Sequence, residues 1–196
     1  MPWADADPTR RRSYHVGNLR ALLLAEARAI LADGGPASLN LRNLAARAGI
    51  AAGSVYHHYA SKNALLAGLA AEGFRELEEA LRLAAGSETP IRDSALAYFA
   101  FAHRQPGIYA LMFDPPILRA PEVTAARDSA FSVLEQVIGA SASQQDRTPD
   151  QIHQVALAVW ACGHGAASMT LAAGGEGEQP LMEDVIQGLE VLFRRR

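Results

Sequence analysis

The sequence predicts an all-α fold of nine helices. Apolar residues recur at every third or fourth position over most of the chain, and no segment of useful length alternates as a half-buried strand does. Glycine and proline clusters separate the periodic stretches. Apolar residues fill 49% of the 196 positions, enough for a packed core. The helices are expected at residues 14–32, 41–48, 52–59, 62–84, 91–104, 108–113, 121–139, 149–173 and 181–193.

Particular residues are expected to set the ends of these helices. The Gly-Gly-Pro run at residues 34–36 should end the first helix. Ser61 is a candidate N-cap for the fourth helix, because its hydroxyl can accept a hydrogen bond from a free backbone N–H. Thr148 should cap the long eighth helix, with Pro149 as its first residue.

The cysteine count and the apolar runs bear on the compartment. The single cysteine, Cys162, permits no disulfide within the chain, which fits a reducing cytoplasm. Residues 155–175 carry no charge and are long enough to span a bilayer. This stretch is mainly Ala and Gly, contains His164 and lacks basic flanks, so a helix buried on most of its sides is expected instead. We therefore expect a cytoplasmic protein with no membrane partner.

Residues 39–66 have the spacing of a helix-turn-helix motif. Two short expected helices flank a three-residue turn, Gly49-Ile50-Ala51. Gly49 supplies the tight turn. Val55 and Tyr59 lie four positions apart, on one face of the second helix, and can anchor it to a core. A helix of this size is about 12 Å long, which fits a DNA major groove.

The opposite face of that second helix is the candidate DNA-reading surface. Ser54 can bond a base edge or a phosphate, and Tyr56 and His57 can bond phosphate. Lys62, the only lysine, begins the next helix, where its ammonium and the free N–H groups can both meet a phosphate. The candidate DNA-binding residues are Arg42, Asn43, Ala52, Gly53, Ser54, Tyr56, His57, His58 and Lys62. For Arg42 and Asn43 a merely solvated surface position stays open.

The charge distribution agrees with a DNA-binding N-terminal part. The net charge of −3 and the pI near 6.1 are not those of a nucleic-acid binder taken whole. However, residues 1–71 hold eight basic side chains against four acidic ones, whereas residues 72–196 hold ten against seventeen. A basic head on an acidic body suits a protein that binds DNA through its head only.

Three regions are expected along the chain. Residues 1–13 form a flexible arm, residues 14–61 a three-helix DNA-binding domain, and residues 62–196 a C-terminal regulatory and dimerisation domain. The helix over residues 62–84 connects the two domains. The three arginines at positions 10–12 keep two interpretations, a minor-groove contact or a solvated basic tail.

The string from Gly49 to Leu66 closely resembles the signature of the tetracycline-repressor (TetR) family. The shared positions are Gly49, Gly53, Val55, Tyr56, His58, Tyr59, Ser61, Lys62, Leu65 and Leu66. The resemblance covers residues 14–66 and implies a DNA-binding transcriptional regulator, more often a repressor than an activator. Ala51 departs from the pattern, since the family commonly has Ser or Thr there as a helix cap. Such a cap is worth about 1 kcal/mol, so the helix should still form.

The C-terminal part resembles a subgroup of the same family with a Trp-x-x-x-His-Gly motif. Here the motif reads Trp160-Ala-Cys-Gly-His164-Gly165. Residues 101–113 also resemble that subgroup, which usually has His-Pro where this chain has Gln105-Pro106. The resemblance implies a ligand-binding and dimerisation domain but does not identify the ligand.

The middle helices are candidates for an effector pocket that takes an unknown, small and largely apolar molecule, whose binding releases the DNA. Plain core packing is the alternative for these aromatic and methionine residues. The pocket candidates are Phe99, His103, Tyr109, Met112, Phe113, Phe131, Trp160, His164 and Met169. No cofactor and no metal is expected.

The last two helices are expected to form the seam of a homodimer. Small residues on the eighth helix allow close approach of a partner helix, and the ninth ends in an apolar stripe. The candidate interface residues are Ala156, Trp160, Gly163, Ala167, Leu189, Leu192 and Phe193. Two copies of the DNA-reading helix would meet successive major grooves, so the expected partner is a palindromic, double-stranded operator.

An enzyme is not expected. Cys162 and His164 are two positions apart on a helix and point in nearly opposite directions, so they cannot share a proton. His153 and His164 lie about 16 Å apart along the helix axis and cannot ligate one metal ion. The remaining alternative is a helical ligand-binding or scaffold protein that does not bind DNA.

Overall fold

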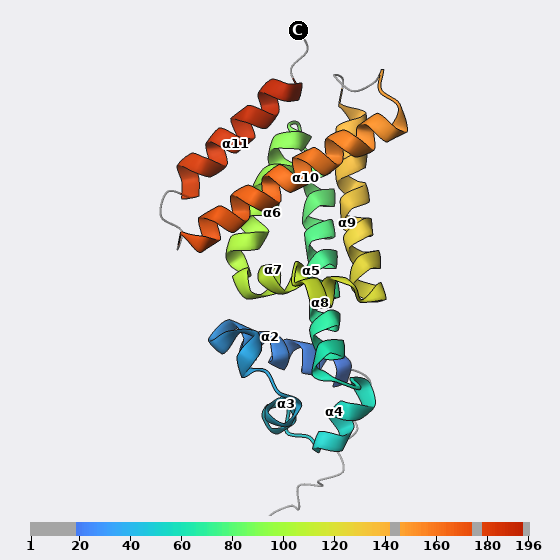
Figure 1. Ribbon diagram of the computed structural model, residues 1–196, viewed down its shortest axis with the longest axis vertical. Coiled ribbons are helices and arrows are strands. Elements are labelled where there is room, and N and C mark those ends of the chain that lie inside the picture. The colour runs from blue at the N-terminus through green and yellow to red at the C-terminus, as the bar shows by residue number, and fades with distance from the viewer. Residues whose placement is uncertain (1–18, 142–145, 174–177, 194–196) are drawn as a thin grey trace, which may run out of the picture. The chain divides into compact units, whose positions relative to one another are not determined.

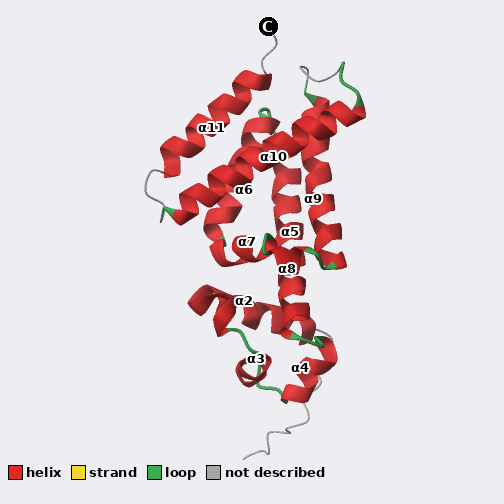
Figure 2. Ribbon diagram, viewed as in Figure 1, coloured by secondary structure: helices red, strands yellow, loops and turns green. Residues whose placement is uncertain are grey.

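The chain is described here by a computed structural model, which covers residues 19–141, 146–173 and 178–193. Helices joined by turns and loops make up all of these ranges (Figure 2), which confirms the all-α prediction. The described residues form ten helices rather than nine, because residues 115–118 form a short extra helix. The helices are α2 (Leu19–Ser38), α3 (Leu41–Arg47), α4 (Ala52–His58), α5 (Lys62–Ala85), α6 (Pro90–Arg104), α7 (Pro106–Met112), α8 (Pro115–Leu118), α9 (Pro121–Ala140), α10 (Pro149–Ala172) and α11 (Glu178–Phe193).

The chain divides into two compact units, Met1–Leu66 and Ala67–Arg196. The division falls inside α5, the helix expected to connect two domains, whereas the boundary expected at residue 61 stays a prediction. The expected arm over residues 1–13 and the first turn of the first expected helix lie outside the described residues.

The first unit packs α2, α3 and α4 around aliphatic side chains. Leu23 of α2, Leu44 of α3 and Val55 of α4 are each fully buried. On the surface, the Arg47 guanidinium lies 3.1 Å from the Glu26 carboxylate and joins α3 to α2. Such an exposed pair contributes little, so the apolar contacts hold the three helices together.

The predicted end of the first helix is wrong, because α2 continues through the Gly-Gly-Pro run to Ser38. Its direction changes there: the Ser38 hydroxyl donates to the Ile30 carbonyl oxygen at 3.1 Å. In a straight helix these residues would be about 12 Å apart along the axis. Glycine and proline thus bend the helix instead of ending it. Leu39, which follows, is buried at 1% exposure.

The predicted caps of α5 and α10 are confirmed. Ser61 Oγ accepts a hydrogen bond from the Ala64 N–H at 3.1 Å. Thr148 Oγ1 accepts from the Gln151 N–H, and the Gln151 side chain accepts from the Thr148 N–H, so the two residues form a full capping box. The last helix starts at Glu178, three residues earlier than expected.

The second unit is a bundle in which α10 packs against α6, α9 and α11 (Figure 1). Phe74, Leu77 and Leu81 of α5 are buried, as are Phe99 and Phe101 of α6.

The inward face of α10 corrects the predicted dimer seam. Ala156 is fully buried in an apolar cluster with Leu134 and Ile138 of α9. Ala167 and Leu189 are also buried within the chain, so these three cannot meet a partner. The buried alanines of α10 allow close approach to its own bundle and do not mark a seam between copies. Trp160 and Gly163 line a cavity inside the same unit. The side chains of Leu192 and Phe193 lie outside the described residues.

The outward face of α10 is apolar and exposed, which corrects the expectation of a helix buried on most sides. Only 22% of its most apolar stretch is buried, and Leu157 and Met169 are 54% and 63% exposed. Within the described ranges, α10 alone is long and apolar enough to cross a membrane. A single helix of this kind is weak evidence for a membrane span.

The contact of α5 with α7 depends on Gly73. A Cβ added at Gly73 would lie 2.6 Å from Ile108 Cγ2 and 2.7 Å from Met112 Sδ, both on buried side chains. We therefore predict that Gly73→Ala lowers the free energy of unfolding by about 1–3 kcal/mol, because a packed core must shift to admit a methyl group. Urea unfolding followed by circular dichroism measures the change.

Gly165→Ala is the matched control, since a Cβ added at this position within α10 meets nothing within 4 Å. It should leave stability unchanged or raise it by about 0.4–1 kcal/mol, because alanine restricts the unfolded chain. Equal effects of the two substitutions would show that the α5–α7 contact is not tight.

Candidate nucleic-acid interface and ligand cavity

The turn between α3 and α4 has the geometry that its glycine permits. Gly49 has φ of +67°, the only positive φ among the described residues. The Ile50 N–H donates to the Ala45 carbonyl at 3.0 Å, so the backbone closes against the end of α3. Any other L-residue at Gly49 would carry a steric cost from its Cβ. The predicted role of Gly49 is confirmed.

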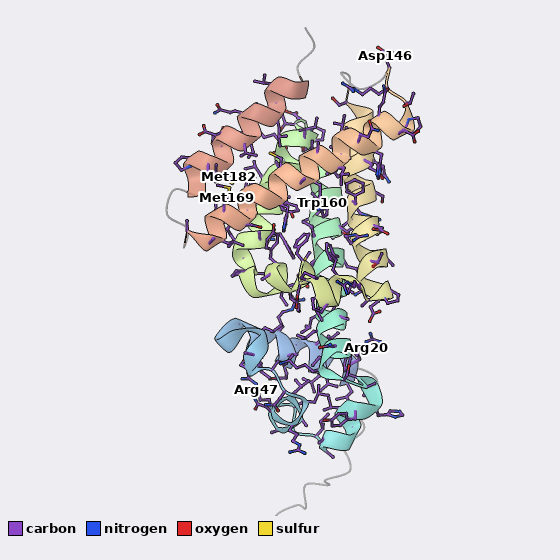
Figure 3. The ribbon with its side chains drawn as sticks, viewed as in Figure 1. Arg20, Arg47, Asp146, Trp160, Met169 and Met182 are labelled. Atoms are coloured by element: carbon purple, nitrogen blue, oxygen red, sulfur yellow. The ribbon has the colours of Figure 1, made fainter. Side chains whose placement is uncertain are left out.

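Two buried side chains hold α4 from one side. Val55 is 0% exposed and Tyr59, the C-cap residue of α4, is 3% exposed. The Arg20 guanidinium of α2 lies 5.5 Å from the centre of the Tyr59 ring, within range of a cation–π interaction (Figure 3 labels Arg20). Tyr59 is thus a core residue, as the sequence predicts.

The other side of α4 is open to solvent. Its side chains form a small, aromatic and hydroxylic surface, with Tyr56 51% exposed and Ser54 partly exposed. None of the nine predicted DNA-binding residues is buried. The exposed members are Arg42, Asn43, Ala52, Gly53, Tyr56, His57 and His58, and the partly exposed ones are Ser54 and Lys62.

The helix starts around this surface are capped unequally. No side chain caps α4, as expected from Ala51, although the Ser54 N–H still bonds the Ala51 carbonyl at 2.9 Å. In contrast, Asn40 Oδ1 accepts from the Asn43 N–H at 2.7 Å and caps α3. This cap is not among the sequence predictions, although an Asn directly before an apolar helical stretch is a typical signal for one.

The second unit contains a partly enclosed, largely apolar cavity of about 40 Å³. Its lining comes from five helices and includes two of the predicted pocket residues, Phe99 and Trp160. The lining residues are Leu81, Ile91, Ser94, Ala95, Tyr98, Phe99, Leu134, Ile138, Val159, Trp160, Gly163 and Leu189. Sequence reasoning missed Ser94 and Tyr98, which share one face of α6 with Ile91 and could have been found from that spacing.

A chain of hydrogen bonds runs from the cavity wall to His164. The Tyr98 hydroxyl lies 3.3 Å from the Tyr109 hydroxyl, which lies 2.7 Å from His164 Nδ1. Tyr109 can therefore accept from Tyr98 and donate to an unprotonated Nδ1. Burial raises the pKa of both tyrosines and lowers the pKa of His164. All three groups are thereby held in their neutral forms near pH 7.

The other predicted pocket residues take different places. Phe113 packs on His164 with ring centres 4.1 Å apart, and Phe131 packs edge-on against Trp160 at 5.6 Å. His103 Nε2 donates to Thr170 Oγ1 at 3.0 Å, since the Thr170 proton goes to the Ala167 carbonyl. Met112 is buried beside Gly73.

Met169 does not belong to the pocket, and its prediction is wrong. It lies on the exposed face of α10, near the C-terminal end of that helix (Figure 3). A methionine at helical spacing indicates an apolar stripe but does not tell which side of the helix the core occupies.

The lowered pKa of His164 predicts a pH dependence of stability. Between that lowered pKa and the ordinary value of 6.5, the unfolded chain binds a proton that the folded chain does not. The free energy of unfolding should therefore fall as the pH drops through this window. We predict a smaller fall between pH 8 and pH 5.5 in His164→Asn than in the unchanged chain, measured by urea unfolding at each pH.

His57→Gln is the control, because His57 is exposed on α4 and makes no part of this chain of hydrogen bonds. It should keep the pH dependence of the unchanged chain. If His164→Asn also keeps it, His164 does not titrate differently on folding.

Comparisons with known proteins agree with this architecture. Residues 23–69 match the family described as "Bacterial regulatory proteins, tetR family", and residues 91–192 match "Tetracyclin repressor-like, C-terminal domain". No protein of curated function matches the sequence. The narrower resemblance to the Trp-x-x-x-His-Gly subgroup stays a prediction.

Several solved structures are similar over nearly the whole chain. A protein of unknown function from Rhodococcus sp. RHA1 is 29% identical, with a TM-score of 0.76 over 93% of this chain and 96% of that one. A tetR-family regulatory protein from Rhodococcus RHA1 is 21% identical, with a TM-score of 0.60 over 86% and 95%. The TetR-like regulator LfrR from Mycobacterium smegmatis, solved in complex with proflavine, is 21% identical, with a TM-score of 0.61 over 87% and 94%.

The C-terminal match alone covers more than half of the chain, and the N-terminal match covers the helix-turn-helix described above. This family is regulatory, not enzymatic. The chain belongs to the TetR family of DNA-binding transcriptional regulators.

Proposed function

We propose that this protein is a cytoplasmic, homodimeric repressor that binds a palindromic operator through α4 and leaves it when a small molecule enters the second unit. The exposed face of α4, set by the Gly49 turn and by burial of Val55 and Tyr59, carries this proposal. TetR-family regulators bind operator DNA and small-molecule effectors and function as dimers.

The character of the α4 surface supports close approach to base edges. Ala52 and Gly53 place little bulk at the start of the helix, so the backbone can approach the groove floor. Ser54 can donate to or accept from a base, and Tyr56 and His57 can donate to phosphates on either side. Affinity then comes mainly from phosphate contacts, among them the one we assign to Lys62.

The outward face of α10 supports a dimer. Its exposed residues between positions 157 and 169 are Leu157, Ala158, Ala161, Cys162 and Met169, none of which carries a charge. Gly188 and Val191 of α11, the helix in contact with α10, are also exposed and uncharged. Covering an apolar face of this kind with a second copy removes it from water, which favours association. We therefore assign the dimer interface to the outward faces of α10 and α11, the two helices that the sequence predicts for it.

The cavity supports regulation by an effector. It lies wholly within the second unit, and five helices contribute to its wall. A ligand there need only bind more tightly to the state that does not hold the operator. The structure of LfrR with proflavine is a precedent in a protein with a similar fold.

The role of Lys62 can be tested on its own. Lys62 is the first residue of α5, where the helix N-terminus also favours an anion. We predict that Lys62→Ala weakens binding to all duplexes about equally, and lowers the slope of log affinity against log salt by about 0.9, since one phosphate contact is lost. Fluorescence anisotropy with the DNA upstream of the protein's own gene and with an unrelated duplex measures both effects.

Lys62→Arg is the matched variant, because it keeps the positive charge at the same position. It should retain most of the affinity and the full salt slope. A salt slope that Lys62→Ala leaves unchanged would remove Lys62 from the phosphate contacts.

A further inference from the structure

The hydroxyl of Ser94 stands out among the polar groups of the second unit. Ser94 is 2% exposed, and its Oγ is buried with no hydrogen-bond partner among the described residues. Ser94 lines the apolar cavity of the second unit described above. Leaving a buried hydroxyl unbonded opposes folding, so such a group calls for a partner that the chain itself does not supply.

The rest of the cavity wall defines what kind of partner fits. No lining residue carries a charge, and apart from Ser94 only Tyr98 and Trp160 have polar side-chain atoms. The Tyr98 hydroxyl is already engaged with Tyr109. A charged group in this cavity would lose its hydration without meeting an opposite charge. Burying an uncharged group costs much less free energy.

Water is a poor partner for Ser94 in this place. A buried water molecule needs two to four polar contacts, and the wall offers few beyond the serine itself. We propose that the cavity takes an uncharged, mainly apolar compound with one hydrogen-bonding group, and that Ser94 Oγ bonds that group. This inference rests on the proposed function, because it names the chemical class of the effector.

The size of the cavity requires an opening, and the neighbouring surface supplies one. At about 40 Å³ the partly enclosed cavity holds only a few atoms, but a groove of about 370 Å³ shares part of its wall. Ile91 lines both spaces, and the proposal therefore requires its side chain to turn aside when a ligand binds. Beside it, the Arg92 guanidinium lies 3.1 Å from Glu183 and 3.2 Å from Glu190 and fastens α6 to α11. The ligand thus places its bonding group at Ser94 and extends past Ile91 into the groove.

Three matched probes test the ligand class: 4-ethylphenol, ethylbenzene and 4-ethylbenzoate, titrated into the full chain at pH 7.5 by calorimetry. We expect 4-ethylphenol to bind about five- to tenfold more tightly than ethylbenzene, as one hydrogen bond provides. The charged 4-ethylbenzoate should not bind. Failure of all three to bind, or binding of the benzoate as tightly as the phenol, would overturn the proposal.

Two variants assign the effect to Ser94. Ser94→Ala should remove the advantage of 4-ethylphenol over ethylbenzene, and Ser94→Cys should reduce it. Ser132→Ala is the control. The Ser132 hydroxyl donates to the Ser129 carbonyl at 2.8 Å, and Ser132 does not line the cavity. Unchanged binding of 4-ethylphenol by Ser94→Ala would overturn the proposal.

The melting temperature of Ser94→Ala without ligand is a second, independent measurement. Because alanine removes an unbonded hydroxyl, Ser94→Ala should raise the melting temperature by about 2–4 °C. A lower melting temperature would mean that the hydroxyl is already bonded, which would overturn the argument. A gel shift with and without 4-ethylphenol separates the two levels: binding through Ser94 without release of DNA would sustain the ligand class and reject the effector role.

Discussion

The left-handed backbone at Gly49 is the constraint on which the DNA-reading unit depends. Seven residues are too few for a stable isolated helix, so α4 exists only because its neighbours hold it. The turn at Gly49 brings α4 back against α3, and burial of Val55 and Tyr59 fixes which side faces inward. The opposite side is then exposed by necessity. Small, aromatic and hydroxyl-bearing residues form this exposed surface, which we propose binds DNA, because the anchoring residues occupy the other face.

In the second unit, one helix serves two surfaces. The inward face of α10 carries small residues that pack closely on α9, and Trp160 and Gly163 that border the cavity. The outward face carries Leu157 and Met169, which the chain leaves exposed. A ligand that shifts α10 from within would therefore act on the surface that we assign to the dimer. In this way the proposed effector could change how the two copies are arranged.

Much of the fold follows from local chemistry that the sequence displays. Ser61 and Thr148 cap their helices as predicted, and Gly49 has the positive φ that its turn requires. The bend of α2 was not predictable in the same way, because whether a Gly-Gly-Pro run ends or bends a helix depends on what the following residues bury. Here Leu39 reaches the core and Ser38 bonds back to Ile30.

Which face of an apolar helix is buried depends on contacts that the sequence does not show. The sequence of α10 reveals a stripe of small residues, but not whether it meets its own bundle or a partner, so Ala156 and Ala167 were assigned to the wrong contact. Met169 was placed inward for the same reason. Its spacing from Ile91 and Tyr98 could place Ser94 on the inward face of α6, but no spacing shows the state of a hydroxyl. Only the packing of five helices shows that its hydroxyl is enclosed and unbonded.

The proposed function requires that α4 enters the major groove in two copies. Selection of bound duplexes from a random pool, with the full chain at low salt, tests this most directly. We predict enrichment of a palindrome whose half-site centres lie about 10 base pairs apart, or a multiple of that, as two recognition helices on one face of the duplex require. A pool from which no duplex is enriched, or only a single unrepeated half-site, would contradict the account.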